Sequence, residues 1–397
     1  MNEKYKYLII GNGISCLSAI REIRKNDKEE TIAVISKEPY LTYYRIKLTE
    51  CISKDFKDEE LLVNKQEWYD EKKVKVVLNK IAKKINVTES SIELDDGMKI
   101  FYEKLLLTVG SSPFFPPIIR KCEDGIFALR TIEDLRHIKE YFNHCKSITV
   151  IGGGLLGLEA AWSIKNLQKE VNVIEFSPFL LPNQLDEEIS RKLERKLFDM
   201  GINIYLNSSC EEILGEDEVN GIKLKNNGEI HTDAVLFSTG VRSNLGLVRE
   251  TDIDFDRGIK VDSHMRTNLK NIYAAGDAAQ VDGKVLALWS AGNEQGKVAG
   301  ANMSGGEREY TSAIPYTTLE IGDVSLFSAG NIKIYDDLYE FRDENNGIHH
   351  KLFSCDGKIT GVILFGDIKG MNKFRKAVID KEDVKKCLED NVGFRKI

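Results

Sequence analysis

The sequence feature that most constrains the fold is a pattern that occurs twice along the chain. A short apolar run leads into a glycine-rich turn, a helix-like stretch and a second apolar run, once over residues 7–35 and again over residues 148–175. In such a unit the first glycine allows a tight turn, the second lets the backbone approach a pyrophosphate, and the third lets the helix pack closely on the strand. The repeat therefore predicts two parallel α/β units that each bind a dinucleotide.

The second copy carries the complete glycine pattern, with Gly152, Gly154 and Gly157. The helix that follows the turn presents free N–H groups and a positive dipole to the phosphates. The acidic residue of this unit is Glu175, which ends the next apolar run and is placed to bind both ribose hydroxyls. Its charge would repel a 2′-phosphate, and no arginine follows in residues 176–178. We therefore expect NADH rather than NADPH.

The first copy departs from the pattern at one position. Gly11 and Gly13 are present, but Cys16 stands where the third glycine would be. We interpret Cys16 as a small packing residue at a slightly wider contact between helix and strand. The acidic residue of this unit is Glu38.

Later segments indicate how the two units are arranged along the chain. Apolar runs that end in glycine recur at residues 105–110, 234–240 and 272–277, and prolines cluster at 113–117. After residue 306 short alternating stretches predict antiparallel strands, followed by a helical tail. We predict an α/β protein with two Rossmann-like domains and a small C-terminal α+β domain. The predicted boundaries are 1–114 with 235–305 (first dinucleotide domain), 115–234 (second dinucleotide domain) and 306–397 (C-terminal domain).

Composition excludes several classes of function. The net charge of −7 over 397 residues disfavours non-specific binding to nucleic acid. The seven cysteines form no C-x-x-C or C-x-x-x-x-C pair, which disfavours a disulfide framework, a zinc site and an iron–sulfur site. No apolar run approaches the ~20 residues of a membrane helix. We expect a cytoplasmic protein with no metal site, no nucleic-acid partner and no membrane association.

Together these motifs resemble those of the pyridine nucleotide–disulfide oxidoreductases, a superfamily of flavoproteins with two dinucleotide sites. The resemblance covers nearly the whole chain and implies that the first unit binds FAD and the second binds NADH. Thr239 and Gly240 resemble the family's "ATG" turn. Ala275, Gly276 and Asp277 resemble the second FAD motif, whose aspartate binds a ribityl hydroxyl.

The segment 43–49 separates branches of this superfamily. Disulfide reductases carry C-x-x-x-x-C here and single-cysteine reductases carry one cysteine, but our alignment places Arg45 at that position. Cys51 follows six residues later, and no His-Pro pair occurs anywhere in the chain. Chemistry through a thiol is therefore disfavoured, with coenzyme A-disulfide reductase as the alternative if Cys51 were reactive.

The same segment is similar to that of rubredoxin and ferredoxin reductases and of the flavin part of nitrite reductase. Ferredoxin reductases carry a lysine near flavin N5 where this chain has Glu50, so we expect Lys47, one turn earlier on the same helix face, to replace it. Glu159 is its expected partner by the flavin and nicotinamide. Trp289 is placed either against the flavin or in the core.

We expect the catalytic residues to be Lys47, Glu159 and Arg45, with Arg45 or Lys47 supplying a cation near flavin N1 and N5. The expected cofactor-binding residues are Gly11, Gly13, Ile14, Ser15, Glu38, Arg45, Lys47, Ile81, Thr108, Gly110, Gly152, Gly154, Leu156, Gly157, Glu159, Glu175, Gly240, Gly276, Asp277 and Trp289.

The resemblance implies that electrons pass from NADH through FAD to a small acidic iron–sulfur carrier. Nitrite reductases are longer and add further domains, so the NADH:rubredoxin oxidoreductase branch, with rubredoxin as the acceptor, fits this chain better. Lysine and arginine outnumber acids in the tail, and residues 369–396 are the candidate docking surface. The alternatives are an NADH oxidase that reduces O₂ and a non-catalytic, NADH-responsive redox sensor. We expect a monomer or homodimer, and a composition that suits an anaerobe.

Overall fold

The structure, a computed structural model, describes residues 3–225, 228–311, 314–389 and 393–397. The chain divides into two compact units, each built from segments that are distant in sequence. Unit 1 contains Met1–Lys47, Phe56–Phe114 and Gly240–Ala313, and unit 2 contains Leu48–Asp55, Phe115–Thr239 and Ile314–Ile397. The three-domain boundaries given above stay a prediction.

Unit 1 is built on a seven-stranded sheet with a parallel centre. Its strands, in sheet order, are β3 (Val74–Val77), β2 (Ile32–Ile35), β1 (Glu3–Ile10), β6 (Lys99–Leu107), β5 (Ser91–Leu94) and β4 (Ala82–Asn86), with β19 (Ile272–Ala274) pairing β6. Strands β3, β2, β1, β6 and β19 run parallel, whereas β5 and β4 form an antiparallel extension. Parallel strands of this kind are buried on both faces, which explains their continuous apolar runs.

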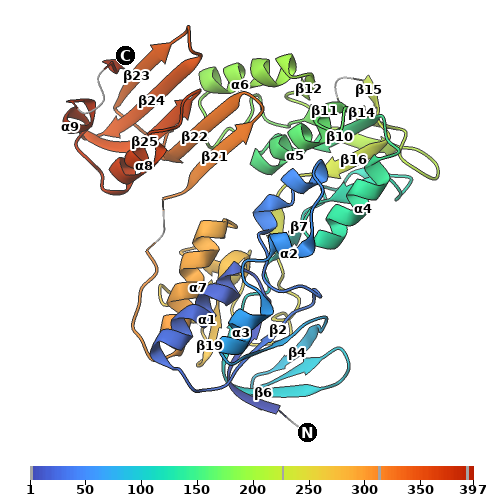
Figure 1. The fold of residues 1–397 in the computed structure, drawn as a ribbon, viewed down its shortest axis with the longest axis vertical. Coiled ribbons are helices and arrows are strands. Elements are labelled where there is room, and N and C mark those ends of the chain that lie inside the picture. Colours follow the sequence, from blue (N-terminus) through green and yellow to red (C-terminus); the bar gives the residue numbers. More distant parts are fainter. Residues whose placement is uncertain (1–2, 226–227, 312–313, 390–392) are drawn as a thin grey trace. The chain divides into compact units, whose positions relative to one another are not determined.

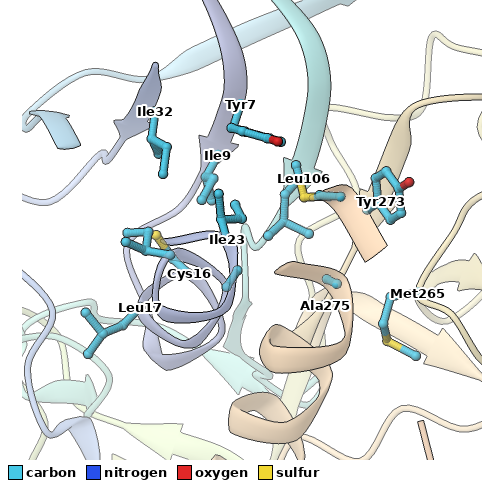
Figure 2. Packing of buried hydrophobic residues seen from close by; sticks show 14 of the residues in the cluster. Tyr7, Ile9, Cys16, Leu17, Ile23, Ile32, Leu106, Met265, Tyr273 and Ala275 are labelled. Carbon is cyan, nitrogen blue, oxygen red and sulfur yellow. The ribbon is translucent and has the colours of Figure 1, made fainter. Parts of the chain in front are cut away.

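The two faces of β1 contribute to separate cores. Tyr7 and Ile9 point to one face and Leu8 and Ile10 to the other, because side chains alternate along a strand. Figure 2 shows the first of these cores, in which Tyr7 and Ile9 meet side chains of the two helices that cover this face. Cys16 lies within this core and is fully buried.

Two helices, α1 (Ile14–Asn26) and α7 (Trp289–Met303), lie side by side on this face of the sheet (Figure 1). Their close approach depends on two glycines of α7. A Cβ on Gly296 would lie 2.2 Å from the carbonyl oxygen of Ser15, and one on Gly300 would lie 2.4 Å from that of Ala19. The helices therefore pack backbone to backbone, and no larger residue fits at either position without a shift.

The remaining elements of unit 1 are short. They are the 3₁₀ turns η1 (Arg45–Lys47) and η3 (Gly276–Ala278), the helices α2 (Asp58–Leu61) and α3 (Gln66–Glu71), and the strand pairs β7 (Ser111–Pro113) with β17 (Val241–Ser243) and β18 (Ile259–Val261) with β20 (Ala279–Val281).

Unit 2 contains a second parallel sheet of five strands. In sheet order they are β12 (Ile202–Tyr205), β11 (Glu170–Ile174), β10 (Ser147–Ile151), β16 (Ala234–Phe237) and β9 (Ile126–Ala128). The helices of this part are α4 (Ile132–Phe142), α5 (Leu155–Lys165) and α6 (Glu187–Asp199), and the 3₁₀ turn is η2 (Glu50–Ile52). A smaller sheet joins β15 (Gly228–His231), β14 (Gly221–Leu224), β13 (Cys210–Leu214) and β8 (Ile119–Arg120).

The C-terminal part of unit 2 is a six-stranded antiparallel sheet. In order, its strands are β21 (Tyr316–Ile321), β22 (Val324–Gly330), β25 (Lys358–Phe365), β24 (Ile348–Cys355), β23 (Asp337–Asp343) and β26 (Arg395–Lys396). Helix α8 (Met371–Ile379) packs on β22 and β25, and α9 (Val384–Glu389) follows it (Figure 1). The predicted helical tail is wrong at its end, because Phe394 packs into the core of this sheet and β26 pairs with β23.

A buried lysine joins α6 to the C-terminal sheet. The ammonium of Lys351 lies 2.6 Å from Asp186, 2.7 Å from Glu188 and 3.0 Å from Glu340, and its side chain is only 4% exposed. Asp186 also accepts a hydrogen bond from Ile189 N–H and so caps α6. The three carboxylates compensate the charge of the buried ammonium, and two of them, Glu188 and Glu340, also pair with Arg342.

The architecture confirms the predicted fold class. Each predicted glycine-turn unit forms a parallel strand–helix–strand segment, and the C-terminal sheet is antiparallel with helices on it. Within the part of the chain that the structure describes, no helix combines the length and the apolar character needed to cross a bilayer.

We expect Gly296→Ala to lower the apparent free energy of unfolding by about 1–3 kcal/mol, because its Cβ would meet the backbone of α1 and force the helices apart. Urea denaturation followed by circular dichroism measures the change. Gly246→Ala is the matched control, since a Cβ there meets nothing within 4 Å. Equal stability of the two variants would contradict the close packing of α1 on α7.

Candidate functional site

The turn after β1 has the geometry of a phosphate-binding loop. Gly11 has a φ of +103°, and a Cβ on it would lie 2.1 Å from the carbonyl oxygen of Thr108, so only glycine fits. A Cβ on Gly13, in contrast, would meet nothing within 4 Å. Gly13 is also the N-cap of α1 and has no side-chain cap, so the first N–H groups of the helix are open to an anion.

The turn after β10 repeats this geometry in unit 2. Gly152 has a φ of +115°, and a Cβ on it would lie 2.4 Å from the carbonyl oxygen of Ser238. A Cβ on Gly157 would lie 2.0 Å from the carbonyl oxygen of Gly152, which makes it the helix-packing glycine. Gly154 caps α5 and has open space where its Cβ would be. Both turns therefore have space where a pyrophosphate can approach the backbone, and the residues present fit a bound dinucleotide in each unit.

Cys16 takes the place of the third glycine in the first turn and faces the core. Burial raises the pKa of its thiol well above the ordinary value. A thiol of this kind is inert, which agrees with its interpretation as a packing residue.

Glu175 is held in position at the end of β11. One carboxylate oxygen accepts a hydrogen bond from Gly153 N–H at 2.7 Å and the other from Ser177 N–H at 2.7 Å. Both oxygens keep further lone pairs for ribose hydroxyls. The carboxylate is thus pre-oriented beside the glycine turn, where the adenosine ribose of a dinucleotide is expected.

Glu38, the equivalent acid of unit 1, belongs to a three-residue cluster. Arg45 donates to Glu38 at 2.8 Å and to the Tyr43 hydroxyl at 2.6 Å, and Tyr43 donates to Glu38 at 2.6 Å. The guanidinium of Arg45 therefore lies against the carboxylate expected to bind the adenosine ribose. This contact favours a role for Arg45 at the adenosine end of FAD.

The second FAD motif lies in η3, directly after β19. Asp277 accepts a hydrogen bond from Ser111 Oγ at 2.7 Å, and Gly276 N–H donates to Gln295 on α7 at 2.8 Å. Gly276 has a φ of +78°, and a Cβ on it would lie 2.4 Å from Ser15 Oγ. The structure thus brings Ser15, on the first turn of α1, next to the motif that precedes α7.

Lys47 lies in a stack of aromatic rings at the start of α7. Its ammonium is 5.0 Å from the centre of the Tyr44 ring, and Tyr44 stacks on Trp289 with ring centres 5.7 Å apart. The argument that Lys47 shares a helix face with Glu50 is wrong, because these residues lie in two separate 3₁₀ turns, η1 and η2. Each turn is three residues long, as is usual for 3₁₀ helices, and the expected continuous helix does not form.

Glu159 on α5 is held by Thr49, whose hydroxyl donates to its carboxylate at 3.2 Å. Burial raises the pKa of Glu159 to about 7, although the Thr49 hydrogen bond opposes this shift. The segment that carries Thr49 is fixed by Lys139 on α4, whose ammonium donates to the carbonyl oxygens of Cys51, Ile52 and Lys54. Glu159 is therefore able to donate a proton in a hydrogen bond near neutral pH.

The other predicted cofactor residues lie in turns next to strands or in the first turn of a helix. Ile14 and Leu156 lie in the first turns of α1 and α5, and Leu156 is 50% exposed. Thr108 lies after β6, with its hydroxyl 3.1 Å from Ile10 O and 2.9 Å from Gly11 O. Gly110 (φ +67°) and Gly240 (φ +88°) form turns that flank β7 and β17, and Ile81 is 42% exposed just before β4.

Cys51 lies within unit 2 and is only 8% exposed. None of the seven cysteines, all of which lie in the described ranges, forms a disulfide. The arrangement gives no support to a redox-active pair.

Several residues of these clusters were not predicted from the sequence, among them Ser111, which binds Asp277, Tyr44, which stacks on Trp289, and Thr49, which binds Glu159. Tyr44 and Thr49 lie within segment 43–49, which separates branches of the superfamily. Their place in this segment was the only sequence signal for a role in the site. Ser111 carries no local signal, because its partner is distant in sequence.

Comparisons with known proteins match two parts of the chain to known families. Residues 5–296 match the family described as pyridine nucleotide-disulphide oxidoreductase, and residues 315–382 match the rubredoxin NAD⁺ reductase C-terminal domain. The chain is 32% identical over 378 residues to an NADH-rubredoxin oxidoreductase of Clostridium acetobutylicum, covering 94% of both chains. A crystal structure of NADH:rubredoxin oxidoreductase from that organism superposes with a TM-score of 0.80 at 29% identity, covering 96% of each chain.

Another relative is much longer. A nitrite reductase [NAD(P)H] of Bacillus subtilis is 33% identical over 386 residues, which is 96% of this chain but 48% of that protein. The chain thus spans about half the length of this relative. With the family match over residues 5–296, these findings show that the chain belongs to the pyridine nucleotide-disulphide oxidoreductase family, which binds FAD and uses NADH, as the two glycine turns predict.

Proposed function

We propose that the chain is an NADH-dependent flavin oxidoreductase that passes electrons to a small iron–sulfur protein, with rubredoxin as the acceptor. The observation that carries this proposal is the match of residues 315–382 to the rubredoxin NAD⁺ reductase C-terminal domain. This match is independent of the dinucleotide-binding part, which many oxidoreductases share. The relative from Clostridium acetobutylicum, whose length this chain matches, is named for the same acceptor.

The proposed mechanism requires no protein nucleophile. When bound, FAD would accept a hydride from NADH and would release electrons one at a time. The Gly11 turn and the N-terminus of α1 hold the FAD pyrophosphate, and Glu38 with Arg45 holds its adenosine ribose. Asp277, oriented by Ser111, binds the ribityl chain.

In unit 2 the chain binds and orients the nicotinamide dinucleotide. The Gly152 turn and α5 hold the pyrophosphate, and the fixed carboxylate of Glu175 selects the ribose without a 2′-phosphate. We propose that Glu159, protonated near neutral pH, donates a hydrogen bond to the nicotinamide carboxamide.

Lys47 is the proposed charge that favours reduced flavin. Its ammonium lies on the Tyr44–Trp289 stack at the N-terminus of α7, where the helix dipole adds positive potential. A cation close to the flavin ring lowers the free energy of the anionic reduced form.

The docking surface remains the basic tail, with α8 as its central element. Arg375 there lies 4.1 Å from the centre of the Tyr316 ring, and Lys376 pairs with Asp380. Lys386 pairs with Glu382 and Lys396 with Asp337, so part of the positive charge is already neutralised. Asp390, in the same tail, lies outside the described residues. An acidic carrier would therefore dock by local contacts rather than by a strong overall field.

Anaerobic stopped-flow mixing tests the function. We expect NADH to bleach the flavin rapidly, NADPH to act much more slowly, and oxidised rubredoxin to restore the flavin colour faster than O₂ does. Fast reoxidation by O₂ with a sluggish rubredoxin step would instead establish an NADH oxidase. A reduced flavin that persists with every acceptor would favour the redox-sensor alternative, and stoichiometric thiol formation from coenzyme A disulfide would favour the thiol alternative.

We expect Lys47→Gln to lower the two-electron reduction potential of the flavin by about 15–30 mV, because a cation that favours the reduced form is lost. Spectroelectrochemical titration measures the potential. Lys47→Arg keeps the charge and should leave the potential close to that of the parent. If the Gln and Arg variants titrate alike, Lys47 does not act on the flavin through its charge.

The raised pKa of Glu159 predicts a pH-dependent stability. A carboxyl whose pKa rises from 4.5 to about 7 on folding takes up a proton, so its contribution to stability falls as the pH rises from about 5 to 8. Glu159→Gln removes this dependence, and its stability relative to the parent should increase by about 1–2 kcal/mol over that range, allowing for partial solvent screening. Urea unfolding at several pH values tests this, with Glu140→Gln, an exposed acid on α4, as the control. If the free energies of unfolding of the parent and of Glu159→Gln changed with pH in the same way, the raised pKa of Glu159 would be contradicted.

A further inference from the structure

Two neighbouring residues at the start of η2 lie in opposite environments. Thr49 is only 7% exposed, and its hydroxyl donates to Glu159 Oε2 at 3.2 Å. The side chain of Glu50 is 63% exposed and pairs with Lys54 at 3.3 Å. The group that this turn directs at Glu159 is therefore the neutral hydroxyl of Thr49 and not the charged side chain that follows it.

The direction of Thr49 is fixed by contacts one turn farther along α5. Ser163 lies four residues after Glu159, so the two side chains share a face of the helix. Ser53 N–H donates to Ser163 Oγ at 3.2 Å, and Ser163 Oγ donates to the carbonyl oxygen of Glu50 at 3.3 Å. The backbone after Thr49 is thus bonded to the same helix face that carries Glu159.

Helix α4 holds the end of the turn. Lys139 donates to the carbonyl oxygens of Cys51, Ile52 and Lys54 at 3.0, 3.2 and 2.8 Å, which matches the three donors of an ammonium group. Its hydrogen bonds therefore go to the backbone of this segment rather than to Glu159.

The charged neighbour that acts on Glu159 is Glu50. Burial is the main cause of the raised pKa of Glu159, and the like charge of Glu50 adds to it, whereas the Thr49 hydroxyl lowers it. Both causes that raise the pKa favour the protonated carboxyl group.

The contact with Thr49 distinguishes the two oxygens of that carboxyl group. A protonated carboxyl has one oxygen that accepts a hydrogen bond and one that carries the proton. Because Oε2 accepts from Thr49, the proton belongs on Oε1. Among the described residues none forms a hydrogen bond with Oε1, so its proton is free to bind a ligand.

We propose that Thr49 is a positioning residue for Glu159: its hydroxyl engages Oε2 and directs the proton on Oε1 to the nicotinamide carboxamide. The inference rests on the proposed function, in which Glu159 donates to that group. A hydroxyl suits this role better than an ammonium, because a cation at this place would favour the ionised carboxylate, which cannot donate.

The FAD-loaded protein tests the proposal with two ligands. Anaerobic stopped-flow measures the half-saturating NADH concentration for flavin reduction across a range of pH, and isothermal titration calorimetry measures the dissociation constant of ADP-ribose, which lacks the nicotinamide. We expect Thr49→Val to raise the half-saturating NADH concentration by about 3- to 10-fold on the acid side, because an oriented hydrogen bond is lost. The dissociation constant of ADP-ribose should stay that of the parent.

The pH profile gives a second readout that a merely structural role would not move. Loss of the profile's midpoint in Glu159→Gln assigns that midpoint to Glu159. In Thr49→Val we expect the midpoint to rise by about 0.5–1 pH unit, because a donor to the ionised form is removed.

Thr49→Ser keeps the hydroxyl and should restore both values. Thr360→Val is the matched control, since it removes a threonine hydroxyl of unit 2 that donates to Phe353 O at 3.3 Å in the C-terminal sheet. A midpoint in Thr49→Val that stays or falls, a Thr49→Ser variant that behaves like Thr49→Val, or equal weakening of NADH and ADP-ribose would overturn the proposal.

Failure of the proposed function is recognised separately. If NADH does not reduce the flavin of the parent protein, the proposed function fails. The pH dependence of urea unfolding then decides the role of Thr49 without NADH, since Thr49→Val must still move the midpoint that Glu159→Gln removes, and an unmoved midpoint would overturn the positioning role as well.

Discussion

Both dinucleotide sites depend on the same steric constraint, the close approach of one strand-end turn to the end of a neighbouring strand. At Gly11 and at Gly152 the space for a Cβ is taken by a backbone carbonyl oxygen of the adjacent strand end, at 2.1 Å and 2.4 Å. This approach allows the following helix to begin at the sheet edge with its N–H groups free. The positions of Glu38 and Glu175, one strand further on, follow from the same geometry, because parallel strands end at a common edge.

Three glutamates of the expected sites differ in their hydrogen-bond partners and in their burial. Glu175 is held by two backbone N–H groups and Glu38 by Arg45 and Tyr43, so both side chains are fixed beside the expected riboses. Glu159 has one hydroxyl partner and is largely removed from water, which raises its pKa to about 7. The three acids thus differ in their hydrogen-bond partners, and burial suits Glu159 to donate a hydrogen bond near neutral pH.

Within unit 2, ion pairs join the C-terminal sheet to helix α6 of the nucleotide-binding part. Lys351, buried on β24, faces three carboxylates, of which Asp186 and Glu188 belong to the start of α6. These ion pairs fix the start of α6 against β24, although a buried salt bridge is by itself weak evidence for stability. The part of the chain that matches the rubredoxin NAD⁺ reductase C-terminal domain is therefore attached at a defined place on unit 2.

The sequence by itself determined the fold class and the two glycine turns, because strand periodicity and glycine spacing are local properties of the chain. It also indicated Cys16 as a packing residue, because a small side chain there takes the place of the helix-packing glycine. The tertiary structure decided the contacts between residues that are apart in sequence: Ser111 with Asp277, Thr49 with Glu159, and Arg45 with Glu38. The continuous helix expected from Lys47 to Glu50 is two separate turns, and the tail returns as a strand. These outcomes depend on which residues from distant segments form hydrogen bonds, ion pairs or apolar contacts. The spacing of residues along the chain does not determine these contacts.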